Sequence, residues 1–233
     1  VSGSVTVDGS QATYTPPANY NGDDSFTFTA SDGDLSATAT VTLTVTAVND
    51  APVLASVLDV SFDEDGSSST SLLGSDVDGD DLEYSISSGT DIIATIDGAN
   101  IAFTASQDFN GSESFTATVT DGEFSSSQNF TVTVTAINDA PALASVDAVS
   151  FDEDGSGATT LVGSDIDSDG LTYSITDGTD ITATVDGSTV SFTASSNFNG
   201  SEDFTATVTD GEFTSPRTFT VTVNAVNDTP VLD

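Results

Sequence analysis

One motif returns along this chain at a constant interval, and this periodicity constrains the fold more than any other feature. Asn-Asp-Ala-Pro at residues 49–52 is repeated at 138–141, and Asn-Asp-Thr-Pro follows at 227–230, so that each copy begins 89 residues after the one before. Phe-Asp-Glu-Asp-Gly at 62–66 is likewise repeated at 151–155. A fixed period without insertions is the signature of tandem structural units. The sequence therefore predicts several copies of one small fold.

The period also sets the expected domain map. Residues 51–139 and 140–228 are predicted to be complete repeats, residues 1–50 match the later half of one, and residues 229–233 begin another. Modules of roughly 100 residues are an ordinary size for a small domain. We expect residues 1–50 to lack their opening strands, which a neighbouring chain could donate.

Within each repeat, apolar residues alternate with polar ones, most of which are threonine. The segment 130–134 reads Phe-Thr-Val-Thr-Val, and 219–223 copies it. A period of two places one face of a strand in a core and the other in water. Turn-forming pairs separate such runs, as at 110–111 (Asn-Gly) and 121–122 (Asp-Gly), and no helical period is present. The chain is therefore predicted to be all-β, with tandem immunoglobulin-like β-sandwiches of about seven short antiparallel strands each.

The charge balance excludes several kinds of partner. The chain has 38 acidic residues and one basic residue, Arg217, with no His, which gives a formal net charge of −37. Nucleic acids and anionic membranes bind positive surfaces, so neither is an expected partner. No apolar run is long enough for insertion into a membrane, and the absence of Cys removes disulfides and thiolate metal sites.

Catalysis is not expected of this chain. Without His, Cys or Lys, it cannot pair a nucleophile with a conventional base. Two carboxylates alone can serve a glycosidase. Here, however, the acidic clusters recur along the chain, and a repeated motif suits a scaffold better than a single active site. We therefore predict that the protein is not an enzyme.

The carboxylates gather in segments that resemble turns. The segment 76–81 contains four Asp residues, and its copy at 165–170 contains three. Two like charges ~4 Å apart repel by about 4 kcal/mol at an effective dielectric near 20, and the chain has no nearby Lys or Arg to offset this. Hard oxygen ligands in irregular loops favour Ca²⁺ over other metals. The alternatives are a solvated acidic face and, at 121–122, a plain Asp-Gly turn.

These motifs resemble those of a known family. The linker at 49–52 and the Asp-Val-Asp at 76–78 are similar to cadherin repeats and to the cadherin-like tandem repeats of large bacterial surface adhesins. So is the strand pattern at 82–86, which follows the acidic segment. Glu64 resembles the cadherin acidic residue near the first strand, and Asp121 resembles the Asp late in the module.

The resemblance implies an extended rod whose junctions between neighbouring repeats bind Ca²⁺. Two positions depart from the family pattern, because Ala51 replaces an Asn of the linker and Asp-Phe-Asn-Gly at 108–111 replaces Leu-Asp-Arg-Glu. One of the three ions usual at a cadherin junction would therefore lose ligands. The ligands that the resemblance implies are Asn49, Asp50, Glu64, Asp76, Asp78, Asp121, Asn138, Asp139, Glu153, Asp165, Asp167 and Asp210.

Taken together, these features predict a calcium-stiffened structural extender of a secreted or cell-surface adhesin, whose partners are the neighbouring repeats of the same chain. The alternative is a subunit or segment of a self-assembling extracellular filament or surface layer, built from identical chains by strand donation. A third interpretation, a carbohydrate- or ice-binding face, would use the threonine rows, for example at 131–135 and 218–222.

Overall fold

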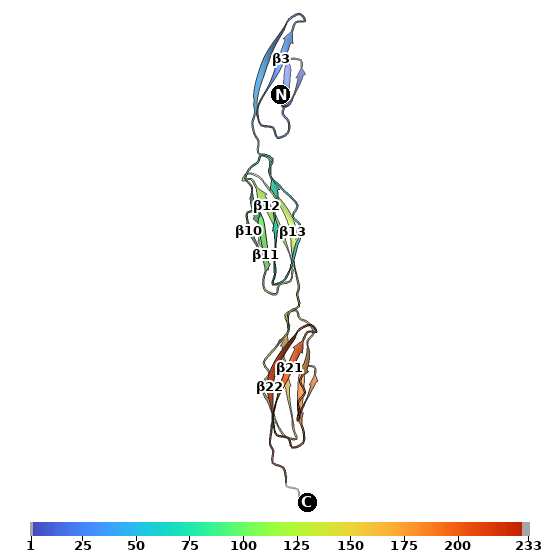
Figure 1. The fold of residues 1–233 in the computed structure, drawn as a ribbon. Coiled ribbons are helices and arrows are strands. Elements are labelled where there is room, and N and C mark those ends of the chain that lie inside the picture. Colours follow the sequence, from blue (N-terminus) through green and yellow to red (C-terminus); the bar gives the residue numbers. More distant parts are fainter. Residues whose placement is uncertain (1, 230–233) are drawn as a thin grey trace. The chain divides into compact units, whose positions relative to one another are not determined.

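A computed structural model describes residues 2–229 of the chain (Figure 1). It divides into two compact units, Val1–Ala136 and Ile137–Asp233. Every regular element of the described residues is a β-strand. These residues therefore include no helix that is long and apolar enough to cross a membrane. Residues 230–233, which make up most of the segment expected to begin another repeat, lie outside the described residues.

The first unit contains the strands β1 to β13. Their bounds are β1 (Ser4–Asp8), β2 (Gln11–Thr15), β3 (Gly22–Ser31), β4 (Ser36–Val45), β5 (Val53–Leu54), β6 (Val60–Asp63), β7 (Ser67–Ser71), β8 (Gly74–Ser75), β9 (Glu83–Ile86), β10 (Ile92–Asp97), β11 (Asn100–Ala105), β12 (Gly111–Thr120) and β13 (Ser125–Thr135).

The second unit contains the strands β14 to β22. Their bounds are β14 (Ala142–Leu143), β15 (Val149–Asp152), β16 (Ser156–Thr160), β17 (Gly163–Ser164), β18 (Thr172–Ile175), β19 (Ile181–Asp186), β20 (Thr189–Ala194), β21 (Gly200–Thr209) and β22 (Thr214–Asn224).

Strands β5 to β13 form a repeat with two main sheets. One sheet has the order β10-β11-β7 and the other has the order β6-β13-β12-β9, while β5 pairs with β8. Neighbouring strands are antiparallel except β6 and β13, which are parallel. Strands β14 to β22 repeat this arrangement in the second unit. The predicted all-β, immunoglobulin-like fold is confirmed.

The core lies between the two main sheets, and the alternation in the sequence fills it. On β12 and β13 the apolar residues point inward, and the threonines between them are wholly or partly exposed. Phe103 from one sheet meets Phe115 and Phe130 from the other, with ring centroids 5.5 and 6.0 Å apart in edge-to-face contacts. The same trio recurs in the second unit as Phe192, Phe204 and Phe219. Such contacts add stability beyond the burial of apolar area.

Residues 2–50 keep the alternating pattern but bury none of their side chains. They form two hairpins, β1 with β2 and β3 with β4. Phe26 corresponds to the buried Phe115, yet it is only half-buried, and Phe28 is 52% exposed. The hairpins correspond to β10–β11 and β12–β13 of a complete repeat, and the Tyr14 hydroxyl of β2 donates to Asp24 of β3, but counterparts of β5 to β9 are absent among the described residues.

Candidate cation sites at the acidic loops

A turn built by Asp76 opens the acidic loop between β8 and β9. Asp76 Oδ1 accepts the backbone N–H groups of Asp78, at 2.8 Å, and Gly79, at 3.2 Å. This is the Asx-turn that Asp side chains favour, and Gly79 has the positive φ of 83° that glycine adopts at little cost. The local sequence therefore fixes Asp76 with one oxygen committed to the backbone.

The second oxygen of Asp76 has no such partner. Asp76 Oδ2 is buried, and no hydrogen bond to it is found within residues 2–229. Burying a carboxylate oxygen without a partner costs free energy, and the cost is higher for a charged group than for a neutral one. An oxygen of this kind is what a bound cation would satisfy.

The linker before β5 lies against this loop. Asp50 donates its backbone N–H to Asp78 Oδ2 at 2.8 Å, and Asn49 donates its side-chain Nδ2–H to Asp121 Oδ2 at 3.0 Å. Within the first unit the structure thus links four of the predicted ligands in two pairs, one at the acidic loop and one at the turn between β12 and β13.

The second unit repeats these contacts. Asp139 donates its N–H to Asp167 Oδ2 at 2.7 Å, and Asn138 Nδ2 donates to Asp210 Oδ2 at 3.0 Å. Asp165 Oδ1 accepts the N–H of Asp167 at 2.9 Å. Asp165 Oδ2 is buried and, within residues 2–229, lacks a hydrogen-bond partner, as Asp76 Oδ2 does.

Sequence reasoning placed Asp80 in the acidic cluster but not among the ligands. Carboxylate oxygens of Asp76, Asp78 and Asp80 all lie within 4.8 Å of one another. The signal that could have identified Asp80 is the spacing of these residues, with one residue between each Asp and the next.

The carboxylates at the β12–β13 and β21–β22 turns stay ionised at neutral pH. The N–H of Phe124, helped by that of Glu123 and by the Asn49 amide, holds the pKa of Asp121 below its usual value. Burial opposes ionisation of Asp210, but the Asn138 amide and backbone N–H groups outweigh it and lower the pKa. A cation could bind either carboxylate without displacing a proton.

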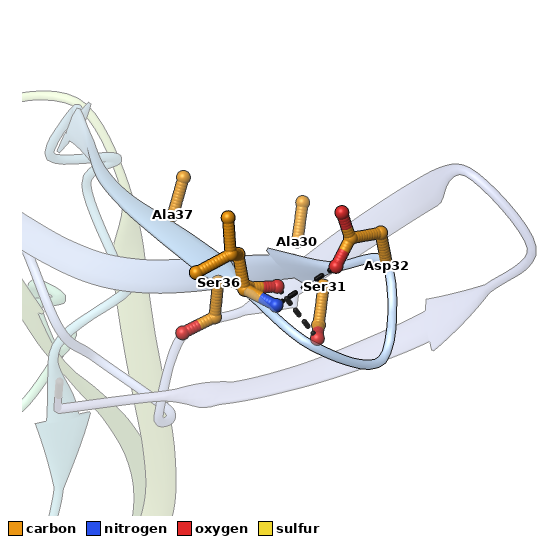
Figure 2. Close-up of a pocket in the computed structure, with 6 residues that line it drawn as sticks. Ala30, Ser31, Asp32, Ser36 and Ala37 are labelled. Atoms are coloured by element: carbon orange, nitrogen blue, oxygen red, sulfur yellow. Dashed lines mark hydrogen bonds between the residues drawn. The ribbon is translucent and has the colours of Figure 1, made fainter.

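The turn between β3 and β4 helps to distinguish a structural role of an Asp-Gly turn from a metal-binding role. Figure 2 shows Asp32, which occupies the place of Asp121: Asp32 Oδ1 accepts the N–H of Leu35 at 2.8 Å, and Ser31 Oγ donates to the Leu35 carbonyl at 2.9 Å. This turn lines an open pocket with Ala30 and Ala37. The Asp-Gly turn therefore forms without an acidic loop beside it, so its geometry alone does not indicate a metal.

Glu64 and Glu153 lie at the other strand ends of their repeats. Glu64 is buried, and its backbone N–H donates to the carbonyl of Thr135, the last residue of β13, at 3.0 Å. Glu153 makes the same contact with Asn224 at 2.9 Å, and its carboxylate accepts the N–H of Val226. Within each unit, neither glutamate joins the contacts around Asp76 or Asp165, so their role as ligands stays a prediction.

The residues at each acidic loop fit a hard divalent cation. All the side-chain donors are carboxylate or amide oxygens, which suit Ca²⁺ better than zinc or copper. Each loop also presents one buried oxygen that the described protein atoms leave unsatisfied. The same arrangement occurs in both units, although the two loop sequences differ.

Comparison with known proteins places the chain in a family. A family model described as a bacterial Ig domain matches residues 1–45, 49–135 and 138–224. No curated protein matches the chain.

Among solved structures, mouse cadherin-23 EC22-24 has a TM-score of 0.58 at 17% identity, over 96% of this chain and 83% of that one. A protocadherin fragment, PcdhgB3 EC1-4, has a TM-score of 0.59 at 15% identity, over 93% of this chain and 61% of that one. An endo-fucoidan hydrolase, MfFcnA4_H294Q from glycoside hydrolase family 107, has a TM-score of only 0.34 at 21% identity, and although 96% of this chain is covered, it spans 37% of that enzyme.

At these identities the cadherin structures show a shared fold and nothing more, and the hydrolase supports no inference. The family model matches most of the sequence and identifies three copies of its domain. The chain belongs to the bacterial Ig domain family.

Proposed function

We propose that this chain is a calcium-stabilised extender segment of a large secreted or cell-surface adhesin, and that it is not an enzyme. The observation that carries the proposal is the pair of buried, unsatisfied oxygens, Asp76 Oδ2 and Asp165 Oδ2, at equivalent places in the two complete repeats among the described residues. A cation would remove this cost in each repeat.

The ligands of each site would come from one linker and the repeat that follows it. In the first unit Asn49, Asp50, Asp76, Asp78 and Asp121 would hold the ion, with Asp80 as an added ligand. Bound Ca²⁺ would supply the positive charge that the chain lacks. The chain's own contribution is to hold the Asp50 backbone N–H against the acidic loop and the Asn49 amide against the turn between β12 and β13, which orders the linker.

An ordered linker is what an extender needs. A short segment between two domains is a hinge unless its backbone is fixed. The two hydrogen bonds from the linker already fix it in part, and a cation shared between linker and loop would fix it further. The function would then lie in length and stiffness.

Thermal unfolding with and without calcium tests this proposal. Extracellular calcium modules bind with dissociation constants of about 10⁻⁴–10⁻³ M, so 10 mM Ca²⁺ should stabilise each site by about 1.4–2.7 kcal/mol. For domains of this size that is a rise in Tm of roughly 5–15 °C. An equal ionic strength of NaCl is the control, because salt alone screens the repulsion between acidic groups. The same Tm in both salts would contradict the proposal.

Self-assembly into a filament is the alternative function. The half-exposed apolar face of β3 and β4 would have to be covered by another chain. An exposed apolar face does not by itself identify what covers it, so this face does not favour assembly. Size-exclusion chromatography in calcium separates the two functions, because an extender runs as a monomer.

A further inference from the structure

The connection between β9 and β10 passes from one main sheet to the other. β9 is an edge strand of the four-stranded sheet, and β10 is an edge strand of the three-stranded sheet. At its start, Ser87 donates its N–H to the Thr116 carbonyl on β12, and the Thr116 N–H donates to Ser87 Oγ, both at 3.0 Å. The rest of this connection, residues 88–91, must be held against the end of the core by other contacts.

Glu113 supplies those contacts from β12. It is half-buried and belongs to the inward-facing row of β12 that includes Phe115. Its Oε1 accepts the N–H of Asp91 at 2.8 Å, and its Oε2 accepts the N–H of Thr90 at 2.9 Å. Gly89 makes this approach possible, because a Cβ there would lie 2.3 Å from Glu113 Oε2.

The second repeat contains the same arrangement. Glu202 accepts the N–H groups of Thr179, Asp180 and Ile181 at 3.0, 2.8 and 3.3 Å. A Cβ at Gly178 would lie 2.5 Å from Glu202 Oε2. The carboxylate and the glycine are thus matched in both complete repeats.

Residues 2–50 show what happens without such a connection. Asp24, at the position that corresponds to Glu113, accepts the N–H of Ser2 and the hydroxyl of Tyr14, both at 2.7 Å. The acidic residue is retained, but its partners differ. The carboxylate held by a loop is therefore a feature of the complete repeats.

We propose that Glu113 is an acid-sensitive anchor, which holds the connection between the two sheets against the core while ionised and releases it when protonated; Glu202 is the matching anchor of the second repeat by its contacts. An ionised carboxylate accepts several N–H groups strongly, whereas a protonated one keeps less acceptor capacity and carries a donor. The chain has no disulfides, and each anchor instead uses hydrogen bonds to fix the connection between the two sheets. Other titratable groups near the first anchor are Asp91 in the connection itself and Asp108 in the segment after β11; β13, beside β12, carries none.

The electrostatics of Glu113 agree with this geometry. Burial opposes its ionisation, but the N–H groups of Asp91, Thr90 and Ile92 outweigh burial and hold the pKa below the ordinary value. A lowered folded-state pKa gives a contribution to stability that is complete above the unfolded-state pKa, near 4.3. That contribution is lost as the pH falls through the lower, folded-state pKa.

Hydrogen exchange in calcium-free protein tests the anchor. In Glu113→Gln, the protection factors of the Thr90 and Asp91 amides should fall roughly tenfold or more at neutral pH, because hydrogen bonds to a charged acceptor are lost. The Thr179 and Asp180 amides of the second repeat should not change. Glu83→Gln, which neutralises an exposed carboxylate on β9, is the matched control and should leave all four amides as they were.

Unchanged protection of Thr90 and Asp91 in Glu113→Gln would overturn the proposal. Should that variant fail to fold, a pH titration of the wild-type chain decides instead. The carboxyl ¹³C signal of Glu113 and the protection of Thr90 should then change together, with one midpoint below the ordinary glutamate range. Protection that persists after Glu113 has titrated would equally overturn it. Because calcium is absent throughout, neither outcome depends on the proposed calcium sites.

Discussion

The two acidic loops, 76–81 and 165–170, make the same turn from different sequences. In both, the first Asp uses Oδ1 to accept a backbone N–H two residues later and keeps a buried Oδ2 without a protein partner in the described chain. In both, the third residue accepts the N–H of the linker. The shared features are therefore those that position an oxygen for a cation.

The loops differ in charge and in backbone strain. The first loop has four Asp residues and places Gly79 at a positive φ of 83°. The second has three Asp residues, ends on Gly170, and places Ser168 at a φ of 66°. A residue with a Cβ is strained in that region, whereas glycine is not.

These differences indicate how the two repeats should depend on calcium. More carboxylates at a site repel one another more strongly without a cation and bind one more tightly. The first repeat should therefore be the less stable without calcium and should gain more from it. The second loop loses some stability to strain whether or not an ion is bound.

Replacing the first Asp of one loop should have the largest effect. Asp76→Asn keeps an oxygen for the turn but replaces the unsatisfied oxygen with an amide, so calcium affinity in the first repeat should fall at least tenfold, or about 1.4 kcal/mol. Calorimetric titration measures this loss. Asp97→Asn, which changes an exposed residue at the end of β10, is the control. Equal calcium affinities of Asp76→Asn and the wild type would contradict the role of the unsatisfied Asp76 oxygen in binding calcium.

A second difference lies at β13 and β22. Asp59 Oδ1 accepts the N–H of Thr131 at 2.7 Å, whereas Ala148 stands at the corresponding position of the second repeat. Asp59→Ala should destabilise the first repeat by about 1 kcal/mol, because a hydrogen bond to a carboxylate is lost. Urea unfolding, monitored through amide hydrogen exchange in each repeat, measures this change in the free energy of unfolding. Ala148→Asp tests the converse, and a loss of stability there would mean that the two sites are not equivalent.

Exchanging the strained residues should have the smallest effect. Ser168→Gly should stabilise the second repeat by about 0.5 kcal/mol, since relief of strain is partly offset by the freedom glycine gains on unfolding. Gly79→Ser should destabilise the first repeat by a similar amount. Thermal unfolding in chelator measures both changes. If both variants shift Tm in the same direction, backbone strain does not distinguish the loops.

Much of the fold could be predicted from the sequence because its signals are local. The period identified tandem units, and the alternation at 130–134 identified strands whose apolar residues face a core. The parallel pairing of β6 with β13 was not predicted, because it joins segments about 70 residues apart and no local pattern specifies it. The boundaries at 51–139 and 140–228 stay predictions.

The candidate sites could be predicted only in part. The repeated Asp-x-Asp pattern singled out Asp76 and Asp78, but a turn and a ligand have the same sequence, as Asp32 illustrates. Which oxygen is left unsatisfied depends on backbone geometry, and so does the contact of Asp80 with its neighbours. Glu113 was missed entirely, because its partners are backbone N–H groups that leave no trace in the residue types around them.

Carboxyl ¹³C spectra during a calcium titration test the central claim most directly, because they report on single side chains. The account predicts that the signals of Asp76 and Asp165 shift early and saturate, while those of Asp97 and Asp186, exposed at the ends of β10 and β19, follow ionic strength alone. Uniform small shifts of all four signals, matched by NaCl, would contradict it.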